Sequence, residues 1–210
     1  MPRTVAERAD ALPALGEVFR EHGYEGASLA RISAATGMGK GSLYHFFPGG
    51  KEEMLAAALA DIDNWFETKM FAHLRDPRAP ETAIAEMFAA TEGYFRSGRR
   101  VCLVGAIAIA DARDAFAAPV RSYFQRWIAA LASALRRTGM GSEQAAECAE
   151  SVVAGIQGAI VLSRAIDDPR AFSRVLARLA DGLSPPSRAR PKDTLASRLL
   201  GLRDQKEEPS

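Results

Sequence analysis

The 210-residue chain has few cysteines, no excess of charge of one sign and no long uninterrupted hydrophobic run. Its two cysteines, Cys102 and Cys148, are too few for a disulfide framework and fit a reducing compartment. The formal net charge of +1 gives no general attraction to nucleic acid or to membranes. The N-terminus lacks the apolar core of a signal peptide, and the most apolar runs, VCLVGAIAIA and VVAGIQGAIVL, are too short to span a bilayer. We therefore expect a cytoplasmic protein with no membrane partner and no bound cofactor.

The chain also lacks the residue spacings that several kinds of active site require. Gly50-Lys51 looks like the end of a nucleotide-binding phosphate loop, but His45 stands where that loop needs glycine and Glu52 where it needs serine or threonine. The histidines and cysteines have none of the close spacings that hold zinc, and no serine, histidine and aspartate arrangement stands out. We expect no metal site, no catalytic residues and no enzymatic activity.

A helical periodicity of apolar residues runs along almost the whole chain. Leu12, Leu15, Val18 and Phe19 form one stripe, and Gly23 is a helix stop. The pattern then predicts a long helix over 51–74 and further helices near 80–97, 102–110, 114–137, 142–166 and 169–182. No strand-like alternation is present. We predict an all-α fold of about nine helices, with an N-terminal domain over 1–50, a larger C-terminal domain over 51–183, and a disordered tail over 184–210.

The stretch GMGKGSLYHFFPGGKEEML contains the second half of a helix-turn-helix pattern. Ser28 is placed as an N-cap of a short helix over 29–36, and a second short helix over 40–46 follows after the turn Gly37-Met38-Gly39. The residues expected to pack on the first helix are Ile32, Ala35, Met38, Leu43, Phe46 and Phe47. The face left exposed carries Lys40, Gly41, Ser42, Tyr44 and His45. These residue types suit a DNA groove, because cations and hydroxyls reach phosphates and glycine permits close approach.

Residues Ser28 to Leu55 resemble the N-terminal domain of TetR/AcrR-family transcriptional regulators, and GSLYHFFPGGKEEM is similar to the LmrA/YxaF-like branch of that family. The segments RVCLVGAIAIADARDAF, RWIAAL and IQGAIVLSRAIDDP resemble the family more loosely. The resemblance implies an all-α homodimer that binds double-stranded operator DNA and carries a ligand-binding C-terminal domain. It implies DNA contacts from Ser28, Lys40, Gly41, Ser42, Tyr44, His45 and Lys51. Residues 1–55 contain six cations and seven acids, so DNA binding must depend on the local placement of a few cations.

Aromatic residues of the C-terminal half recur at helical spacings, which fits either a packed core or a cavity for an apolar or aromatic effector. The two alternatives stay open at the level of sequence. The residues expected to line such a cavity are Phe66, Met70, Cys102, Ile107, Tyr123, Trp127 and Gln157. For Cys102 itself, the pattern favours a small buried side chain over a redox sensor.

The segment 142–166 is apolar nearly all the way round. A helix of this kind is covered on two sides, here by the core of the domain and by a two-fold partner. The residues expected at the homodimer interface are Val152, Val153, Ile156, Ile160, Val161 and Arg164.

These features together predict a dimeric one-component transcriptional regulator. We expect a repressor that a small apolar or aromatic effector releases from a palindromic operator, with the long helix over 51–74 coupling the two sites. The alternative is an all-α small-molecule-binding protein or enzyme that does not bind DNA.

Overall fold

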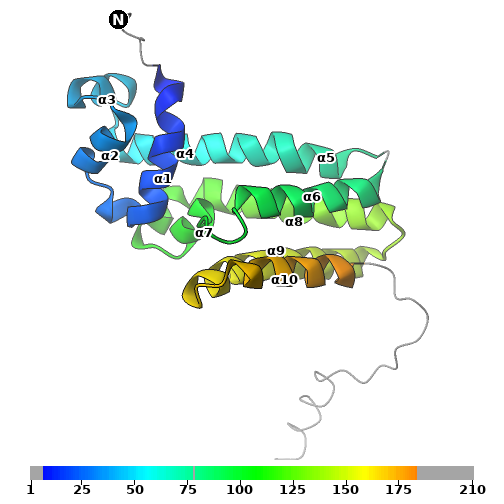
Figure 1. The fold of residues 1–210 in the computed structure, drawn as a ribbon. Coiled ribbons are helices and arrows are strands. Elements are labelled where there is room, and N and C mark those ends of the chain that lie inside the picture. Colours follow the sequence, from blue (N-terminus) through cyan, green and yellow to red (C-terminus); the bar gives the residue numbers. More distant parts are fainter. Residues whose placement is uncertain (1–6, 78, 184–210) are drawn as a thin grey trace, which may run out of the picture.

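The computed structural model describes residues 7–77 and 79–183, and all regular secondary structure in these ranges is helical. Figure 1 shows a small group of helices, α1 to α3, at one end of a longer body that contains α4 to α10. The expected all-α class is confirmed, with ten α-helices among the described residues where about nine were predicted. The tail over 184–210, predicted to be disordered, lies outside the described residues.

The N-terminal head contains α1 (Arg8–Gly26), α2 (Leu29–Thr36) and α3 (Lys40–Phe46), and the last two match the predicted ranges. Gly23 has a φ of 66°, so the first helix is interrupted at the predicted stop although a last turn follows it.

The core of the head consists of side chains from all three helices and from the end of α3. Its fully buried members are Leu15, Phe19, Ile32, Leu43 and Phe47. Two predictions of burial were wrong in degree. Ala35 is exposed and Phe46 only half-buried, because the short α2 and α3 each turn a single narrow stripe towards α1.

The long helix predicted over 51–74 is present, but it is not a uniform α-helix. It begins as α4 (Gly50–Phe66), passes through a π-helical turn over Glu67–Phe71, and ends as α5 (Ala72–Arg75). The wider turn brings both Met70 and Phe71 into the core, although they are neighbours in the chain. Together, α4, the π turn and α5 form one rod. This rod reaches from the head to the far end of the body with one local irregularity (Figure 1).

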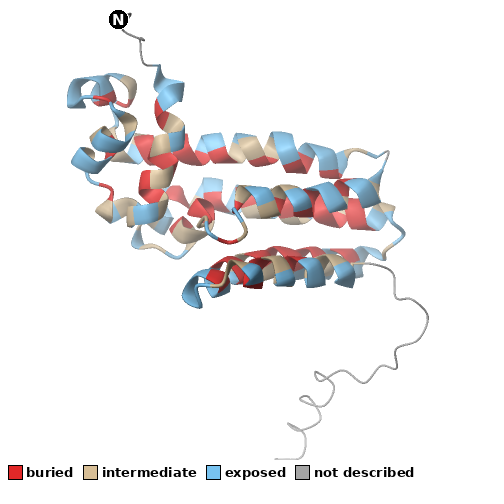
Figure 2. Cartoon of the chain, viewed as in Figure 1, coloured by how far each residue is buried: buried red, intermediate tan, exposed pale blue. Residues whose placement is uncertain are grey.

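The rest of the body is built from the last five helices and one short 3₁₀ segment. These are α6 (Pro80–Tyr94), α7 (Leu103–Ala108), the 3₁₀ segment (Asp111–Phe116), α8 (Ala117–Arg137), α9 (Ser142–Ala165) and α10 (Pro169–Gly182). By length and composition α9 would qualify as a membrane-crossing helix. It packs extensively on α8 and α10, as a core helix of a folded domain does, and the buried residues of Figure 2 run along these contacts.

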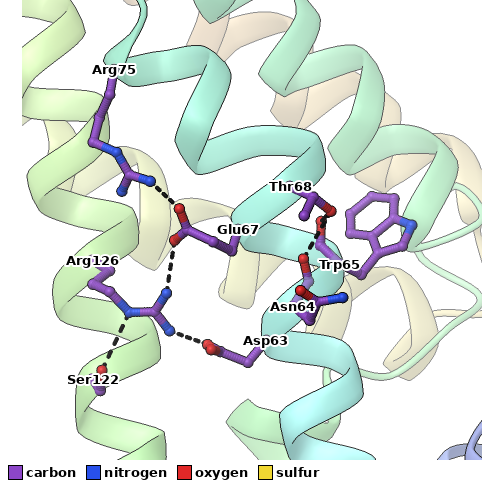
Figure 3. Close-up of polar contacts among 8 residues, drawn as sticks. All are labelled: Asp63, Asn64, Trp65, Glu67, Thr68, Arg75, Ser122 and Arg126. Carbon is purple, nitrogen blue, oxygen red and sulfur yellow. Dashed lines mark hydrogen bonds and ion pairs between the residues drawn. The ribbon is translucent and has the colours of Figure 1, made fainter.

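Arg126 of α8 ties that helix to the rod. Its guanidinium forms ion pairs with Asp63 and with Glu67, the second at 2.9 Å between Nη1 and Oε2. Glu67 also pairs with Arg75, so a single carboxylate joins the π turn to α5 and to α8 (Figure 3). Thr68 donates its hydroxyl to the carbonyl oxygen of Asn64, a local bond that competes with the regular α-helical pattern where the π turn begins.

Candidate DNA-binding interface and effector cavities

The turn between α2 and α3 is held by glycine and by side-chain hydrogen bonds. Gly37 caps α2 with a φ of 68°, which favours glycine at this position. Ser28 caps the start of α2, where its Oγ accepts from the amide of Arg31 at 3.3 Å. The hydroxyl of Ser33 donates to the carbonyl oxygen of Met38 at 2.6 Å, and Thr36 Oγ1 accepts from the Met38 amide. The angle between α2 and α3 is thus set by several local contacts.

The outer face of α3 is exposed and carries the predicted DNA-contact residues. Lys40, Gly41, Ser42, Tyr44 and His45 are all exposed, and nearly half of the Tyr44 surface is accessible. Leu43 lies between them on the opposite face and is fully buried. A cation, two hydroxyls and an imidazole therefore lie together on one side of a helix that its inner face holds in place.

Arg8 holds the end of α3 against the first helix of the head. Its Nε donates to the carbonyl oxygen of Phe46 at 3.2 Å, and its guanidinium lies 4.8 Å from the centroid of the Phe47 ring. The same side chain forms an ion pair with Glu53 of α4 at 3.3 Å. Sequence patterns did not single out Arg8, because no periodicity marks a cation that bridges two helices.

Lys51 differs from the predicted DNA contacts on α3 because its side chain is engaged within the chain. Its Nζ lies 3.7 Å from Glu25 Oε2 and 4.3 Å from the centroid of the Tyr24 ring. A cation at a helix N-terminus needs a compensating partner, and the end of α1 supplies one. Contact between Lys51 and DNA stays a prediction.

The predicted effector-site residues are divided among three places. Phe66, Met70, Ile107 and Trp127 are fully buried in a closed aromatic core. Phe66 lies at its centre, with its ring centroid 4.7 Å from Tyr94, 5.0 Å from Tyr123 and 5.4 Å from Trp127. For these residues the packed-core alternative describes the structure.

Cys102 and Gln157 line a cavity of about 400 Å³ between α7, α8 and α9. Its other lining residues are Val101, Gly105, Ala106, Ala108, Ile109, Phe124, Gly158, Ile160 and Val161, so the wall is almost wholly apolar. The cavity opens to the surface, since Ile109 is 89% exposed.

Tyr123 lines a second cavity, of about 260 Å³, between α4 and α8. Its other walls include Ala60, Asp63, Val120 and Arg126. The Tyr123 hydroxyl is buried and has no hydrogen-bond partner among the described residues, and the same is true of Trp127 Nε1 and Gln157 Nε2. Burial raises the pKa of Tyr123 well above its usual value, so the group is a neutral donor.

The Cys102 thiol is buried, and its Sγ accepts a hydrogen bond from the Gly105 amide at 3.3 Å. Burial raises its pKa, an effect only partly offset by the hydrogen bond from the Gly105 amide. The raised pKa keeps the group protonated, which agrees with the small buried side chain favoured by the sequence.

The predicted dimer-interface residues fall into two groups. Val152, Val153, Ile156 and Ile160 are buried within the single chain, against α8 and α10, and a contact of these residues with a partner stays a prediction. Val161 is 67% exposed and is the one apolar member of the set that a partner can reach. Arg164 is exposed too, but its Nη1 donates to the carbonyl oxygen of Arg99 at 2.9 Å.

The exposed face of α9 carries small and apolar residues, of which the sequence analysis named only Val161. They are Ala154, Gly158, Val161, Leu162 and Ala165, with Ile166 just beyond the end of the helix. These exposed residues recur every three or four positions, and so do the buried residues of the same helix, so spacing alone does not tell the two faces apart.

A helix-turn-helix head joined by one long helix to an all-α body is the architecture of a DNA-binding regulatory protein. Within the residues the structure describes, no group of three or more potential ligands gathers to hold a metal ion.

Comparison with known proteins supports this class. Residues 12–58 match a family profile described as bacterial regulatory proteins, tetR family, and residues 80–178 match the C-terminal domain of LmrA/YxaF-like transcriptional regulators. The chain is similar to the uncharacterized HTH-type transcriptional regulator YxaF of Bacillus subtilis, with 28% identity over 74% of this chain and 84% of that protein. It is 40% identical to the HTH-type transcriptional repressor AcnR of Corynebacterium efficiens over 67 residues, which are 31% of this chain and 35% of that protein.

A TetR transcriptional regulator from Legionella pneumophila has the same fold, with a TM-score of 0.74 at 18% sequence identity, over 86% of this chain and 98% of that one. The chain belongs to the TetR family of bacterial transcriptional regulators, in its LmrA/YxaF branch. The resemblance of residues 28–55 to that family is thereby confirmed.

Proposed function

We propose that the protein is a cytoplasmic homodimeric repressor that binds a palindromic operator through α3. The observation that carries this proposal is the exposed face of α3, on which Lys40, Ser42, Tyr44 and His45 lie together above a fully buried Leu43. Two copies of α3 must enter successive major grooves about 34–36 Å apart, which requires a two-fold symmetric protein and site. The similarity to AcnR, a transcriptional repressor, supports repression over activation.

In this proposal the DNA-binding domain covers 1–50 and the effector and dimerisation domain covers 51–183. The rod of α4, the π turn and α5 belongs to the second domain, but it begins beside α3 and passes the aromatic core. Phe66 of the rod packs on Tyr123 of α8, and Tyr123 packs on Phe124, which lines the cavity proposed below for the effector. The rod and α8 thus form a continuous packed path between the two sites, by which they can be coupled.

For the effector we propose the apolar cavity that Cys102 and Gln157 line. Its volume of about 400 Å³ suits a small molecule, and its wall favours an apolar or aromatic one. The amide nitrogen of Gln157 is buried without a partner among the described residues, so a hydrogen-bond acceptor on the effector would satisfy it.

For the dimer we propose the exposed face of α9 around Gly158, Val161 and Leu162. Small residues such as Gly158 allow two helices to approach closely, and the exposed apolar side chains on either side supply the area to be buried. Because Gly158 and Val161 also line the apolar cavity, the partner copy would come to lie beside the effector.

The test of DNA binding is a gel shift with DNA that flanks the protein's own coding region, at about 50 mM and 200 mM salt. We expect a complex that survives an excess of unrelated DNA of equal length and weakens steeply with salt. Equal affinity for the flanking and the unrelated DNA would favour the alternative, an all-α small-molecule-binding protein or enzyme without operator recognition.

The test of coupling is calorimetric titration of an effector, identified by a thermal-shift screen, with and without operator DNA. Linkage requires operator to weaken effector binding by the same factor as effector weakens operator binding, typically about 5- to 150-fold. Equal effector affinity in both titrations would rule out this release mechanism.

A further inference from the structure

Five arginines gather around a cavity at the junction between the head and the body. The cavity has a volume of about 180 Å³, and its walls are Glu17, Arg20, Glu21, Arg96, Arg99, Arg100, Val101 and Arg164. These walls carry five positive charges and two negative charges. Neither the DNA-binding face nor the effector cavity includes this cluster, which lies towards the C-terminal end of α1, away from α3 (Figure 1).

Three of the arginines come from one strained loop, with the sequence Arg96-Ser97-Gly98-Arg99-Arg100. Arg96 and Ser97 have φ values of 50° and 52°, although neither is glycine, and Gly98 follows at 81°. Left-handed backbone conformations are unfavourable for residues other than glycine and persist only where surrounding contacts hold them. The loop is held because Gly98 packs so closely on α9 and α10 that a Cβ there would lie 2.3 Å from Ser163 Oγ and 2.8 Å from Phe172 Cβ.

A carboxylate of the chain already occupies one edge of this cluster. Glu17 Oε1 accepts from Arg100 Nη2 at 2.6 Å, from Arg100 Nε at 3.0 Å and from Arg20 Nη1 at 2.9 Å. Burial alone would raise the pKa of Glu17, but hydrogen bonding from Arg100 and the charges of Arg20, Arg100 and Arg96 lower it below its usual value. The arginines therefore bind an oxyanion group that the chain itself supplies.

Glu17 does not pair with all the guanidinium groups of the cluster. Among the described residues, the guanidinium groups of Arg96 and Arg99 have neither a hydrogen bond nor an ion pair. The side chain of Arg20 is only 5% exposed, yet its Nε has no hydrogen-bond partner in the described part of the chain. Its guanidinium lies over Gly16, where a Cβ would come within 3.1 Å of Nη1. A buried guanidinium nitrogen without a partner is costly, and an added acceptor would satisfy it.

We propose that this cavity binds a compact polyanion of phosphate chemistry, such as a diphosphate group, through Arg96, Arg99 and Arg100. Guanidinium groups match phosphate oxygens in paired hydrogen bonds, and a surplus of three positive charges favours an anion with more than one charge. The bound anion competes with Glu17 for Arg100. Because Glu17 is on α1 and the loop is fixed to α9 and α10, the anion would loosen a direct link between the head and the body.

The first test is calorimetric titration of the full-length protein with pyrophosphate and, separately, with ADP, at pH 7.5 and constant ionic strength. We expect saturable binding of pyrophosphate. Equal affinity for ADP would mean that the phosphate groups alone are recognised, and tighter binding of ADP would identify a nucleotide as the ligand. Absence of saturable binding of both would overturn the proposal.

Two sets of variants locate the site. The double variant R96Q/R99Q should weaken pyrophosphate binding at least about tenfold, whereas R121Q/R136Q, which removes the same charge from exposed positions of α8, should change it less than about twofold. E17Q should bind pyrophosphate more tightly than the native chain, because the competing carboxylate is neutralised. Equal losses in the two double variants, or weaker binding by E17Q, would contradict the proposal. A loss of DNA affinity in R96Q/R99Q as large as the loss of pyrophosphate affinity would assign the cluster to DNA instead.

Discussion

The head and the body of this protein use their aromatic and polar residues in opposite ways. In the head, Tyr44 and His45 are exposed on α3 while the core beneath them is small. In the body, Phe66, Tyr123 and Trp127 are buried against one another, and the proposed effector cavity lies to one side of them. The difference fits the two proposed roles. A face that contacts DNA needs exposed side chains on a helix whose other side is fixed in a core, whereas a body that couples effector and DNA binding needs a rigid packed centre.

The largest effect should come from the centre of the body. Phe66→Ala removes a fully buried ring that contacts Tyr94, Tyr123 and Trp127, and we expect a loss of about 3–5 kcal/mol in the free energy of unfolding. Urea unfolding followed by circular dichroism measures it. Ile109→Ala, in an exposed position of the same domain, should stay within about 0.5 kcal/mol of the native value. Similar losses of unfolding free energy in both variants would mean that the buried ring of Phe66 contributes no more to stability than an exposed side chain at the rim of the cavity.

The dimer face can be separated from the core by two substitutions one residue apart on α9. Ile160→Arg buries a charge within the chain and should give unfolded or insoluble protein, whereas Val161→Arg should give a folded monomer. Light scattering reports the mass and circular dichroism the fold, with Glu86→Arg on α6 as the control. A folded dimer of Val161→Arg would place the interface elsewhere. A wild-type monomer at micromolar concentration would rule out the proposed homodimer.

In the head, Tyr44 should matter for DNA and not for stability. Tyr44→Ala should weaken operator binding by about 1.5–3 kcal/mol if its hydroxyl donates to a phosphate, and should leave the unfolding midpoint nearly unchanged because the side chain is exposed. Tyr44→Phe separates the hydroxyl from the ring. Fluorescence anisotropy with labelled operator measures both, and native affinity in Tyr44→Phe would show that the hydroxyl makes no contact.

Lys51 lies at the boundary between head and body, and its replacement tests whether it contacts DNA or only stabilises the fold. Lys51→Ala should lower the slope of log affinity against log salt by about 0.9, the value for one phosphate contact, and should weaken binding to all sequences alike. It should also cost a little stability through loss of the contacts with Glu25 and Tyr24. Lys69→Ala, an exposed lysine of the body, is the control. An unchanged salt slope would leave Lys51 with the structural role alone.

The smallest effect concerns the link between the two regions. Because the pKa of Glu17 is lower in the folded chain than its usual value of 4.5, its contacts with Arg20 and Arg100 stabilise the fold above that pH. This contribution falls away as the pH drops through the folded-state pKa. The difference in unfolding free energy between the native chain and Glu17→Gln should therefore be smaller at pH 4 than at pH 7. A difference independent of pH would mean that Glu17 acts by shape rather than charge.

Much of the fold could be predicted because its signals are local. The ends of α2 and α3 follow from Ser28, from Gly37 and from the turn between them, and the structure has the same bounds. The exposed face of α3 follows from the same short pattern, since a helix of seven residues has one inner stripe. The π turn at Glu67–Phe71 could not be predicted, because it depends on how Met70 and Phe71 meet helices far away in the chain.

The sequence by itself determined the all-α class, the helix-turn-helix and the family, because periodicity, caps and a short motif are properties of neighbouring residues. Only the tertiary structure decided which apolar residues form the core and which line a cavity. Ile160 and Val161 are adjacent and alike in composition, yet one is buried under neighbouring helices and the other faces out. Arg20 meets Glu17 as a local pair on the same helix, whereas Arg100 meets Glu17 of α1 although the two residues lie 83 positions apart in the chain. Such contacts depend on packing between distant segments, and no local pattern records them.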